Sequence, residues 1–131
     1  MVSRAKVLLI DDDLEVHRLV ANLLRSDFLI FTATDGVDGV LKAQRFSPDI
    51  VLLDINLAHK YDGFKTLAAL KQLPRMVDVP VLMFTADSTP QSAHLARAAG
   101  AAGYILKHSL TPAQFVSRVQ VAVAHGVTTG A

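Results

Sequence analysis

Four short apolar runs in this chain each end directly at a chemically reactive side chain. The runs and the residues that follow them are 7–10 before Asp11, 50–53 before Asp54, 81–84 before Thr85 and 104–106 before Lys107. Apolar runs of this length, bounded by polar or turn residues, are typical of strands that are buried on both faces of a parallel sheet. Ligands of open parallel sheets bind outside the carboxyl ends of the strands. The sequence therefore predicts carboxylates, a hydroxyl and an ammonium at one edge of a sheet.

Strand and helix patterns alternate along the whole chain. Five strand patterns, at 7–10, 28–33, 50–54, 81–85 and 103–107, are each followed by a helical pattern. Two of the helices are expected to begin at Thr89-Pro90 and Thr111-Pro112, where a capping residue precedes a proline. This alternation predicts an α/β fold with a doubly wound, five-stranded parallel sheet and helices on both faces. The length of 131 residues fits a single domain over 1–131.

Composition excludes several classes of function. Thirteen Lys and Arg against twelve Asp and Glu give a net charge of +1, which provides no general attraction to nucleic acid or to anionic lipid. The chain has no cysteine, so disulfides and thiolate metal sites are ruled out, and its five histidines show no metal-ligand spacing and are expected at the surface. No apolar stretch approaches the roughly 18 residues of a membrane span. We expect a soluble, cytoplasmic protein that binds neither nucleic acid nor membrane directly.

Three carboxylates are candidates for a metal site. Asp11, Asp12 and Asp54 follow two different buried runs, and their negative charges would repel one another unless a cation lay between them. Hard oxygen ligands of this kind select Mg²⁺ or a similar ion. Acidic residues after a strand also cap helices, and for Asp13 we prefer that structural role. Asp54, at the end of a separate run, favours the metal site for the other two.

Lys107 and Thr85 complete the set of polar side chains at the predicted edge. An ammonium at this position would neutralise the carboxylates and could bind a phosphoryl oxygen. The Thr85 hydroxyl could donate a hydrogen bond to the same oxygen. Alone, a lysine at a strand end is usually solvated, and a threonine there reflects strand propensity. The combination of residues, rather than any one of them, indicates a phosphoryl site.

Together these residues resemble the receiver domain of two-component response regulators. The matching pieces are Leu9-Ile10-Asp11-Asp12, Val51-Leu52-Leu53-Asp54, Asp62-Gly63, Phe84-Thr85-Ala86, Ala98-Ala99-Gly100-Ala101 and Tyr104-Ile105-Leu106-Lys107. The resemblance spans a core of about residues 5–124, and its motifs are individually weak but jointly specific. It implies the flavodoxin-like strand order 2-1-3-4-5.

The resemblance also implies a phosphorylation site. It makes Asp54 the nucleophile that accepts a phosphoryl group from a partner histidine kinase or histidine phosphotransfer protein. Mg²⁺ would be bound directly by Asp12 and Asp54, through water by Asp11, and by the backbone carbonyl of Asn56. Lys107 would pair with the phosphoryl group. Such a protein is not an enzyme that acts on a separate substrate, because it catalyses only its own phosphotransfer and dephosphorylation.

A conformational switch and a partner surface follow from the same resemblance. Thr85 would move toward the phosphorylated aspartate, and Tyr104 would turn inward into the space that this movement frees. A downstream effector would bind the face built by the fourth helix, the fifth strand and the fifth helix. Members expected on that face are Gln91, His94, Tyr104 and Arg118. The resemblance also leaves open a dimer that forms on phosphorylation.

The chain departs from the receiver pattern at three places. The loop 55–62 is one residue longer than usual, with Ala58 where a proline is common. Lys107 is followed by His108 instead of proline, and a non-proline cis bond costs about 2.5–4 kcal/mol. The sequence therefore gives no support for the cis peptide that family members have there. Asp87 adds an acidic group at the mouth of the predicted site, and we expect it to alter the lifetime of the phosphorylated state.

Two alternatives remain open at this point. A receiver fold can act as an interaction module without phosphorylation, and the longer loop and His108 leave room for this. The triplet Asp11-Asp12-Asp13 also fits the start of haloacid-dehalogenase-type phosphatases. Those enzymes need a further acidic pair for magnesium, and none follows Lys107.

Overall fold

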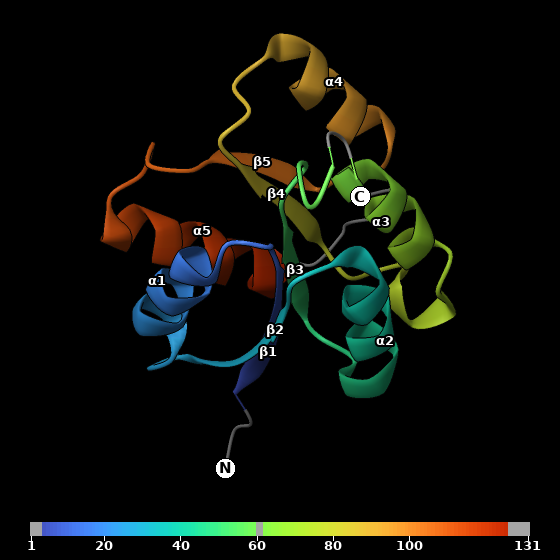
Figure 1. The fold of residues 1–131 in the computed structure, drawn as a ribbon. Helices are drawn as coiled ribbons and strands as arrows, with labels where there is room; N and C mark the ends of the chain where they lie inside the picture. The colour runs from blue at the N-terminus through green and yellow to red at the C-terminus, as the bar shows by residue number, and fades with distance from the viewer. Residues whose placement is uncertain (1–3, 60–61, 126–131) are drawn as a thin grey trace.

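A computed structural model of the chain describes residues 4–59 and 62–125 (Figure 1). Within these residues, five strands alternate with five α-helices, and a short 3-10 helix, η1, precedes the fourth strand. The elements are β1 (Ala5–Ile10), α1 (Leu14–Leu24), β2 (Phe28–Ala33), α2 (Gly36–Phe46), β3 (Ile50–Leu53), α3 (Asp62–Lys71), η1 (Pro74–Met76), β4 (Val81–Thr85), α4 (Pro90–Ala98), β5 (Gly103–Leu106) and α5 (Pro112–His125). The ends of the predicted domain, 1–3 and 126–131, lie outside the described residues.

The strands form one parallel sheet in the order β2-β1-β3-β4-β5. This order confirms the doubly wound, flavodoxin-like topology expected from the sequence. Helices α1 and α5 cover one face of the sheet, and α2, α3 and α4 cover the other (Figure 1). Ile10 is in register with Leu53, so β1 and β3 end at the same level, and Leu53 is in register with Met83, so β4 continues two residues further to Thr85. The residues that follow the strands therefore meet at one edge.

Each face of the sheet has its own apolar core, because side chains of a strand alternate between its two faces. Leu8 and Ile10 of β1 belong to the core under α2, α3 and α4. Val7 and Leu9 belong to the core under α1 and α5. All four side chains are almost completely buried. The continuous apolar run of β1, with no polar face, results from this burial on both sides.

Capping residues set the starts of several helices. Asp13 caps α1 by accepting a hydrogen bond from the backbone N–H of Glu15 at 2.9 Å, which is the structural role preferred for it. Thr89 caps α4 ahead of Pro90, as predicted. Thr111 and Gln114 exchange reciprocal hydrogen bonds at the start of α5, an arrangement that satisfies two orphan donors.

The helix α3 is shorter than the apolar pattern of the sequence. That pattern has helical spacing over 63–73, but α3 ends at Lys71 and η1 follows. Leu73 has an extended backbone because the proline ring of Pro74 disfavours helical angles in the residue before it. The helix therefore ends before the apolar periodicity of the sequence does.

Within the described residues, no helix is both long enough and apolar enough to cross a bilayer.

Gly63 allows α3 to approach the segment that follows β3. A Cβ on Gly63 would lie 2.1 Å from the backbone oxygen of Asp54 and 2.6 Å from Cα of Ile55. The Gly63 N–H donates to the backbone oxygen of Ile55 at 2.6 Å. The colliding atoms belong to backbone and cannot rotate away, so this helix start requires glycine.

We predict that Gly63→Ala destabilises the protein by about 1–3 kcal/mol, the range typical of overpacking. Urea unfolding followed by circular dichroism measures this difference. Ala68→Gly, on the exposed side of the same helix, serves as the control and should lose at most about 1 kcal/mol through helix propensity. Equal or greater stability of Gly63→Ala would contradict the close approach.

Candidate phosphoryl and metal site

The ends of β1 and β3 place two aspartates side by side. The N–H of Asp54 donates to the backbone oxygen of Ile10 at 3.1 Å, which continues the parallel ladder past the end of β3. On the other side of β1, the N–H of Asp11 donates to the backbone oxygen of Ala33 at 3.0 Å. Asp11 is fully buried and Asp54 is 7% exposed. The site therefore contains two carboxylates that are largely removed from water.

Asp12 adds a third carboxylate to this pair. One oxygen each of Asp11, Asp12 and Asp54 can be chosen so that all three lie within 4.8 Å of one another. Asp12 is exposed, so one side of the cluster is open to solvent. Three hard oxygen donors with an open side suit Mg²⁺, which usually keeps several of its waters. The structure thus brings together the three carboxylates that the sequence predicted as metal ligands.

Lys107 lies between the two buried carboxylates. Its Nζ is 2.8 Å from Oδ2 of Asp11 and 3.0 Å from Oδ2 of Asp54. Its backbone N–H donates to the backbone oxygen of Thr85 at 2.8 Å, which extends the pairing of β5 with β4 to the edge. The side chain is 11% exposed. A nearly buried ammonium paired with two carboxylates explains how these negative charges are held close together.

The environment shifts the pKa values of the paired groups. Burial raises the pKa of the Asp11 carboxyl, and the nearby Lys107 ammonium and the Asp13 backbone N–H only partly oppose this effect. For Lys107, burial favours the neutral amine, but contacts with Asp11 and Asp54 outweigh it and raise its pKa above 10.5. Lys107 therefore stays charged at neutral pH.

The Asp11 carboxylate retains capacity for another ligand. Its Oδ1 accepts a hydrogen bond from the Asp13 backbone N–H at 2.9 Å. Its Oδ2 is buried and contacts the Lys107 ammonium, but among the described residues no donor is aligned with it for a hydrogen bond. Each carboxylate oxygen can accept more than one partner, so Oδ2 keeps capacity for an ion or a water beside Lys107. This observation supports a cation, or its bound water, next to Asp11.

Asn56 lies directly beside the predicted nucleophile. Its backbone N–H donates to Oδ1 of Asp54 at 3.2 Å, so the two oxygens of Asp54 contact an amide and an ammonium, respectively. Asn56 is half-buried, as a residue at the rim of the site would be. Its proposed role as a carbonyl ligand of the metal stays a prediction. Residues 60–61, in the longer loop, lie outside the described residues.

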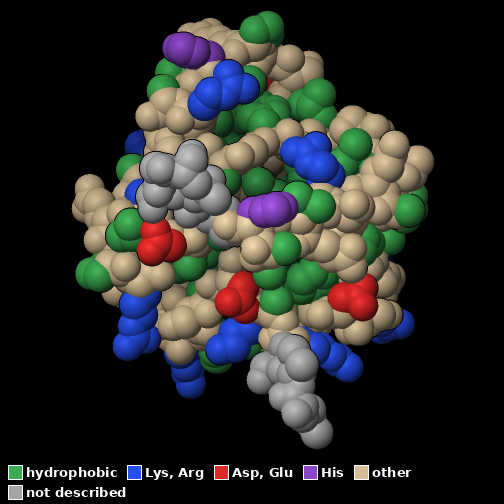
Figure 2. Space-filling view, turned by 180° about the vertical axis from the view of Figure 1, so that it is seen from behind, with side chains coloured by type: hydrophobic (Ala, Val, Ile, Leu, Met, Phe, Trp, Pro, Cys, Tyr) green, Lys and Arg blue, Asp and Glu red, His purple; other side chains and the backbone are tan. Residues whose placement is uncertain are grey.

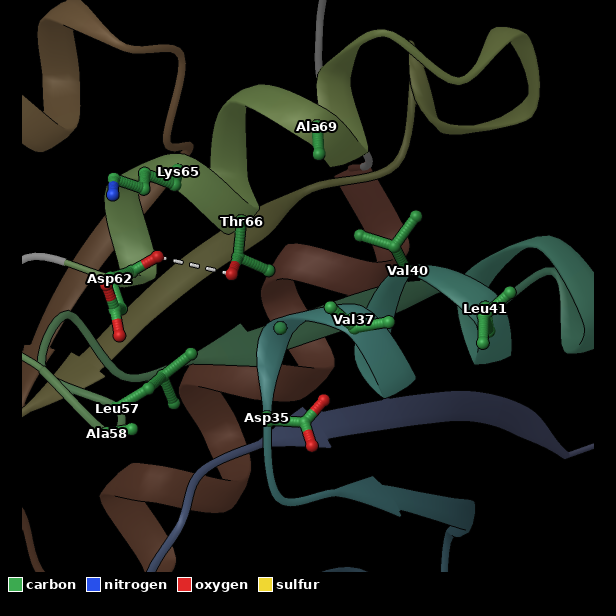
Figure 3. A pocket seen from close by; sticks show the side chains of 11 residues that line it. Asp35, Val37, Val40, Leu41, Leu57, Ala58, Asp62, Lys65, Thr66 and Ala69 are labelled. Carbon is green, nitrogen blue, oxygen red and sulfur yellow. Dashed lines mark hydrogen bonds between the residues drawn. The ribbon is translucent and has the colours of Figure 1, made fainter.

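A separate apolar hollow of about 530 Å³ lies between α2 and α3 (Figure 3). Val37, Val40 and Leu41 reach it from α2, and Leu57 and Ala58 reach it from the loop after β3. The carboxylate cluster and Lys107 do not line this hollow. The charged residues that can perform phosphoryl chemistry therefore lie outside this hollow.

Thr85 and Tyr104 are joined through the backbone of Asp87. Oγ1 of the buried Thr85 accepts from the Asp87 N–H at 3.2 Å, and the Tyr104 hydroxyl donates to the Asp87 backbone oxygen. A movement of Thr85 would therefore disturb the residue that holds Tyr104. The Asp87 carboxylate accepts hydrogen bonds from Thr89 and Ser92 at the start of α4. This helix-capping role was not expected from the sequence.

The Tyr104 hydroxyl is a weaker acid than an ordinary tyrosine. Burial, together with the negative charges of Asp87 and Asp54, raises the pKa of Tyr104 to about 12. The ring is half-buried and packs against the core that lies under α2, α3 and α4. Tyr104 therefore keeps its proton, and its hydrogen bond to Asp87, over the physiological pH range.

His17 contributes a contact that sequence analysis missed. All five histidines were expected at the surface, but His17 is half-buried and its Nε2 lies 2.6 Å from the Asp11 backbone oxygen. A carbonyl oxygen only accepts, so Nε2 carries the proton. Six residues separate His17 from Asp11, and this spacing alone does not bring them together. They meet because α1 turns back over the end of β1, which the sequence does not show. This contact steadies the loop that carries Asp12.

The peptide bond between Lys107 and His108 is trans, as are all peptide bonds of the described residues. His108 adopts a left-handed backbone instead, with φ of 68°. Proline could not adopt this backbone, because its ring fixes φ near −65°, and Lys107 still reaches the carboxylates. Of the residues expected on the partner surface, Gln91, His94 and Arg118 are exposed and Tyr104 is half-buried.

Comparison with known proteins agrees with this geometry. A family model, the response regulator receiver domain, matches residues 7–120. The DNA-binding dual master transcriptional regulator RpaA of Synechocystis is 36% identical over 103 residues, which are 78% of this chain and 42% of that protein. The transcriptional regulatory protein PrrA of Mycobacterium leprae is 35% identical over 120 residues, or 91% and 50% of the two chains.

A solved structure shows the same likeness in three dimensions. The chemotaxis protein CheY4 of Vibrio cholerae superposes with a TM-score of 0.83 at 28% identity, and the match covers 91% of this chain and 98% of that chain. In contrast, this chain spans about half the length, or less, of the two curated relatives.

We predict that Tyr104 titrates near 12. The difference in phenolate absorbance at 295 nm between the wild type and Tyr104→Phe isolates this side chain, and far-UV circular dichroism on the same samples shows that the fold persists. Because the pKa is higher in the folded than in the unfolded protein, the tyrosine's contribution to stability is present below pH 10 and is lost as the pH rises through about 12. A midpoint near 10 would show that the hydroxyl is solvated instead.

We predict that His17→Leu lowers the free energy of unfolding by about 1–3 kcal/mol, because a buried acceptor loses its donor. Urea unfolding measures the change. His94→Leu, at an exposed histidine, is the matched control and should stay within about 0.5 kcal/mol of the wild type. If the two variants were equally stable, the contact between His17 and Asp11 would have no structural role.

Proposed function

This chain belongs to the response regulator receiver family, and we propose that Asp54 is its phosphoacceptor. The observation that carries the proposal is the convergence of Asp11, Asp12 and Asp54 with the Lys107 ammonium at one sheet edge. This arrangement supports phosphoryl transfer because that reaction depends on positioning and on neutralising negative charge. A partner histidine kinase or histidine phosphotransfer protein would supply the phosphoryl group.

In the proposed transfer, an oxygen of Asp54 attacks the phosphorus of a phosphohistidine. A P–O bond forms and the P–N bond breaks, and the electron pair of that bond returns to the histidine nitrogen. Lys107 holds a positive charge where the equatorial phosphoryl oxygens gather negative charge. Bound Mg²⁺, held by Asp12, Asp54 and the Asn56 carbonyl with Asp11 acting through water, would neutralise further charge on the transferred group.

Phosphorylation would then change the hydrogen bonds of Thr85. The acyl phosphate offers new acceptor oxygens, and the Thr85 hydroxyl can donate to one of them only by moving toward Asp54. Its present bond from the Asp87 N–H would break. Because Tyr104 is tied to the same residue, both would shift together, as a two-state element requires. The partner surface around α4, β5 and α5 would thereby report the state of Asp54.

We propose that the protein is a signalling component in the cytoplasm and does not act as an enzyme on a separate substrate. Relatives that match this chain over part of their length are named transcriptional regulators. We propose that this receiver acts on a downstream effector through the surface around α4, β5 and α5. A module that signals without phosphorylation would not need Asp54, Asp12 and Lys107 together. The receiver-domain family model, which matches residues 7–120, favours the receiver over the haloacid-dehalogenase alternative.

The decisive experiment is incubation of the chain with Mg²⁺ and acetyl phosphate, followed by intact mass measurement. We predict one added phosphate, which hydroxylamine removes because an acyl phosphate is labile to it. Asp54→Asn should abolish labelling, and removal of Mg²⁺ with EDTA should suppress it. Asp12→Asn should weaken Mg²⁺ binding by about tenfold or more, because a charged oxygen ligand is lost.

Asp13→Asn is the matched control. It changes a neighbouring carboxylate that caps α1, and asparagine caps helices about as well as aspartate. Labelling of this variant should equal that of the wild type. Labelling that survives in Asp54→Asn, or that is absent from the wild type, would exclude Asp54 as the phosphoacceptor.

A further inference from the structure

The outer side of α2 is apolar. Val37 is 75% exposed and Leu41 is 58% exposed, and these side chains are one turn apart on the same side of the helix. The opposite side of α2 packs toward the sheet, where Gly39 and Ala43 are buried. A helix at the surface usually carries polar residues on its outer side. Packing within this chain therefore explains the inner side of α2 and does not explain the outer one.

A groove runs beside this apolar side, made of two hollows at successive positions along the helix. The first, of about 530 Å³, lies between α2 and α3 (Figure 3). The second, of about 340 Å³, lies between residues 43–44 of α2 and residues 73–76. The eleven residues of α2 rise by about 16 Å, so a helix of about three turns would match this length. We name the two hollows together the α2–α3 groove, which is lined by Val37, Val40, Leu41, Gln44, Ala69 and Leu73.

Short side chains keep the groove open. The two helices are close where they begin, since a Cβ on Gly36 would collide with the side chain of Thr66. Farther along, Ala58 and Ala69 line the first hollow with single methyl groups. Ala58 stands where a proline is common in the receiver pattern, so part of this wall is particular to this chain.

The beginning of the groove is acidic. Asp35 and Asp62 lie at the starts of α2 and α3, and each accepts one backbone N–H, from Asp38 at 2.8 Å and from His59 at 3.0 Å. Neither aspartate forms an ion pair with another described residue. Lys65 also lines this hollow, but its ammonium points away from the apolar side chains (Figure 3).

The other end of the groove is basic. Arg45 lies in the last turn of α2, and Arg75 lines the second hollow. Both are exposed, and neither forms an ion pair within the part of the chain that the structure describes. The view from behind shows Lys and Arg side chains gathered along the lower edge of the molecule, where α2 ends (Figure 2). The groove thus carries opposite charges at its two ends.

We propose that the α2–α3 groove binds an amphipathic α-helix of a partner protein, which lies antiparallel to α2. Val37 and Leu41 would pack against the apolar side of that helix, as in other complexes in which a helix occupies a groove. A helix favours acidic residues in its first turn and basic residues in its last turn, because of its dipole. The antiparallel direction places the basic turn beside the two aspartates and the acidic turn beside the two arginines. Complementary charges of this kind orient a partner.

A second copy of this chain would not fill the groove. If two copies met through antiparallel α2 helices about a two-fold axis, the same patch would meet itself, so one groove would lie against the other. Both hollows would then stay open. The inference does not rest on the proposed function, because neither Asp54 nor Lys107 lines the groove.

The test uses the full chain and a synthetic helix as the probe. This fluorescent peptide of about 14 residues has leucines at every third or fourth position, glutamates in its first turn and lysines in its last turn. A hydrocarbon staple on its polar side keeps it helical. Fluorescence anisotropy should show binding that weakens as NaCl rises. A stapled peptide with glutamines in place of the charged residues should bind about fivefold more weakly, because it lacks the charges at its ends.

Two variants change the groove and leave the phosphoryl site intact. Val37→Glu/Leu41→Glu should lose affinity for the charged peptide about tenfold or more, because two apolar anchors become charged. Ala69→Phe, which fills the first hollow from α3, should do the same without a change of charge. Leu19→Glu/Leu29→Glu, at exposed leucines of α1 and β2, is the matched control and should bind as the wild type does. Circular dichroism checks that each variant is folded.

Charge and direction are measured separately. Arg45→Glu/Arg75→Glu should remove most of the advantage of the charged peptide over its glutamine version. A nitroxide label at the amino end of the peptide should broaden the NMR amide signals of residues 73–76 and leave those of residues 62–66 sharp. Asp54→Asn should bind the peptide as the wild type does, so this result is independent of the phosphoacceptor.

Several results would overturn the proposal. They are absence of binding to the wild type, unchanged affinity of Ala69→Phe, or broadening confined to residues 62–66, which would mean a parallel helix. Self-association of the chain without peptide that Leu41→Glu abolishes, measured by sedimentation, would assign the groove to a second copy instead. Absence of phosphate on Asp54 after acetyl phosphate treatment would remove the proposed function and leave this proposal standing.

Discussion

The contact of the Lys107 ammonium with Asp11 and Asp54 is the interaction on which the site depends. It joins the ends of β1, β3 and β5, which are separated by much of the chain. Two buried carboxylates would repel each other without it, because the interior screens charge poorly. The register of the sheet brings the ends of β1 and β3 to one level, and the long side chain of Lys107 reaches both carboxylates from beyond the end of β5. Three carboxylates against one ammonium leave an excess of negative charge, which a bound Mg²⁺ would neutralise.

The strand that carries this ammonium also connects the site to the surface. Tyr104 lies three residues before Lys107 on β5, and its hydroxyl is bonded to the residue that also contacts Thr85. A change of charge at Asp54 would therefore be transmitted through one short segment, from Thr85 to Asp87 to Tyr104. The surface at the far end of this path, around α4, β5 and α5, carries the exposed Arg97 and Arg118, whereas the phosphoryl site is rich in carboxylates. Separation of the two charge types suits a domain that binds a metal ion at one place and a protein at another.

The sequence predicts the buried strands, their alternation with helices and the meeting of Asp11, Asp54 and Lys107, because each follows from apolar runs and from the common edge of parallel strands. It does not predict the bond from His17 to the Asp11 backbone, since spacing along a chain does not define where a helix lies against a loop. The sequence likewise does not predict that the Asp87 carboxylate caps α4, because that role depends on where α4 begins. The left-handed backbone of His108 is not predicted either, because the sequence shows only that proline is absent at this position.

The most direct test of this account is a crystal structure of the chain grown with Mg²⁺ and beryllium fluoride. We predict that beryllium fluoride is bound to the Asp54 carboxylate and contacts Lys107. We also predict that Mg²⁺ lies about 2.0–2.1 Å from oxygens of Asp12 and Asp54. Thr85 should have left the Asp87 N–H and turned toward the fluorides. A structure with Asp54 unmodified, or with Mg²⁺ at a site that excludes Asp12 and Asp54, would contradict the central claim.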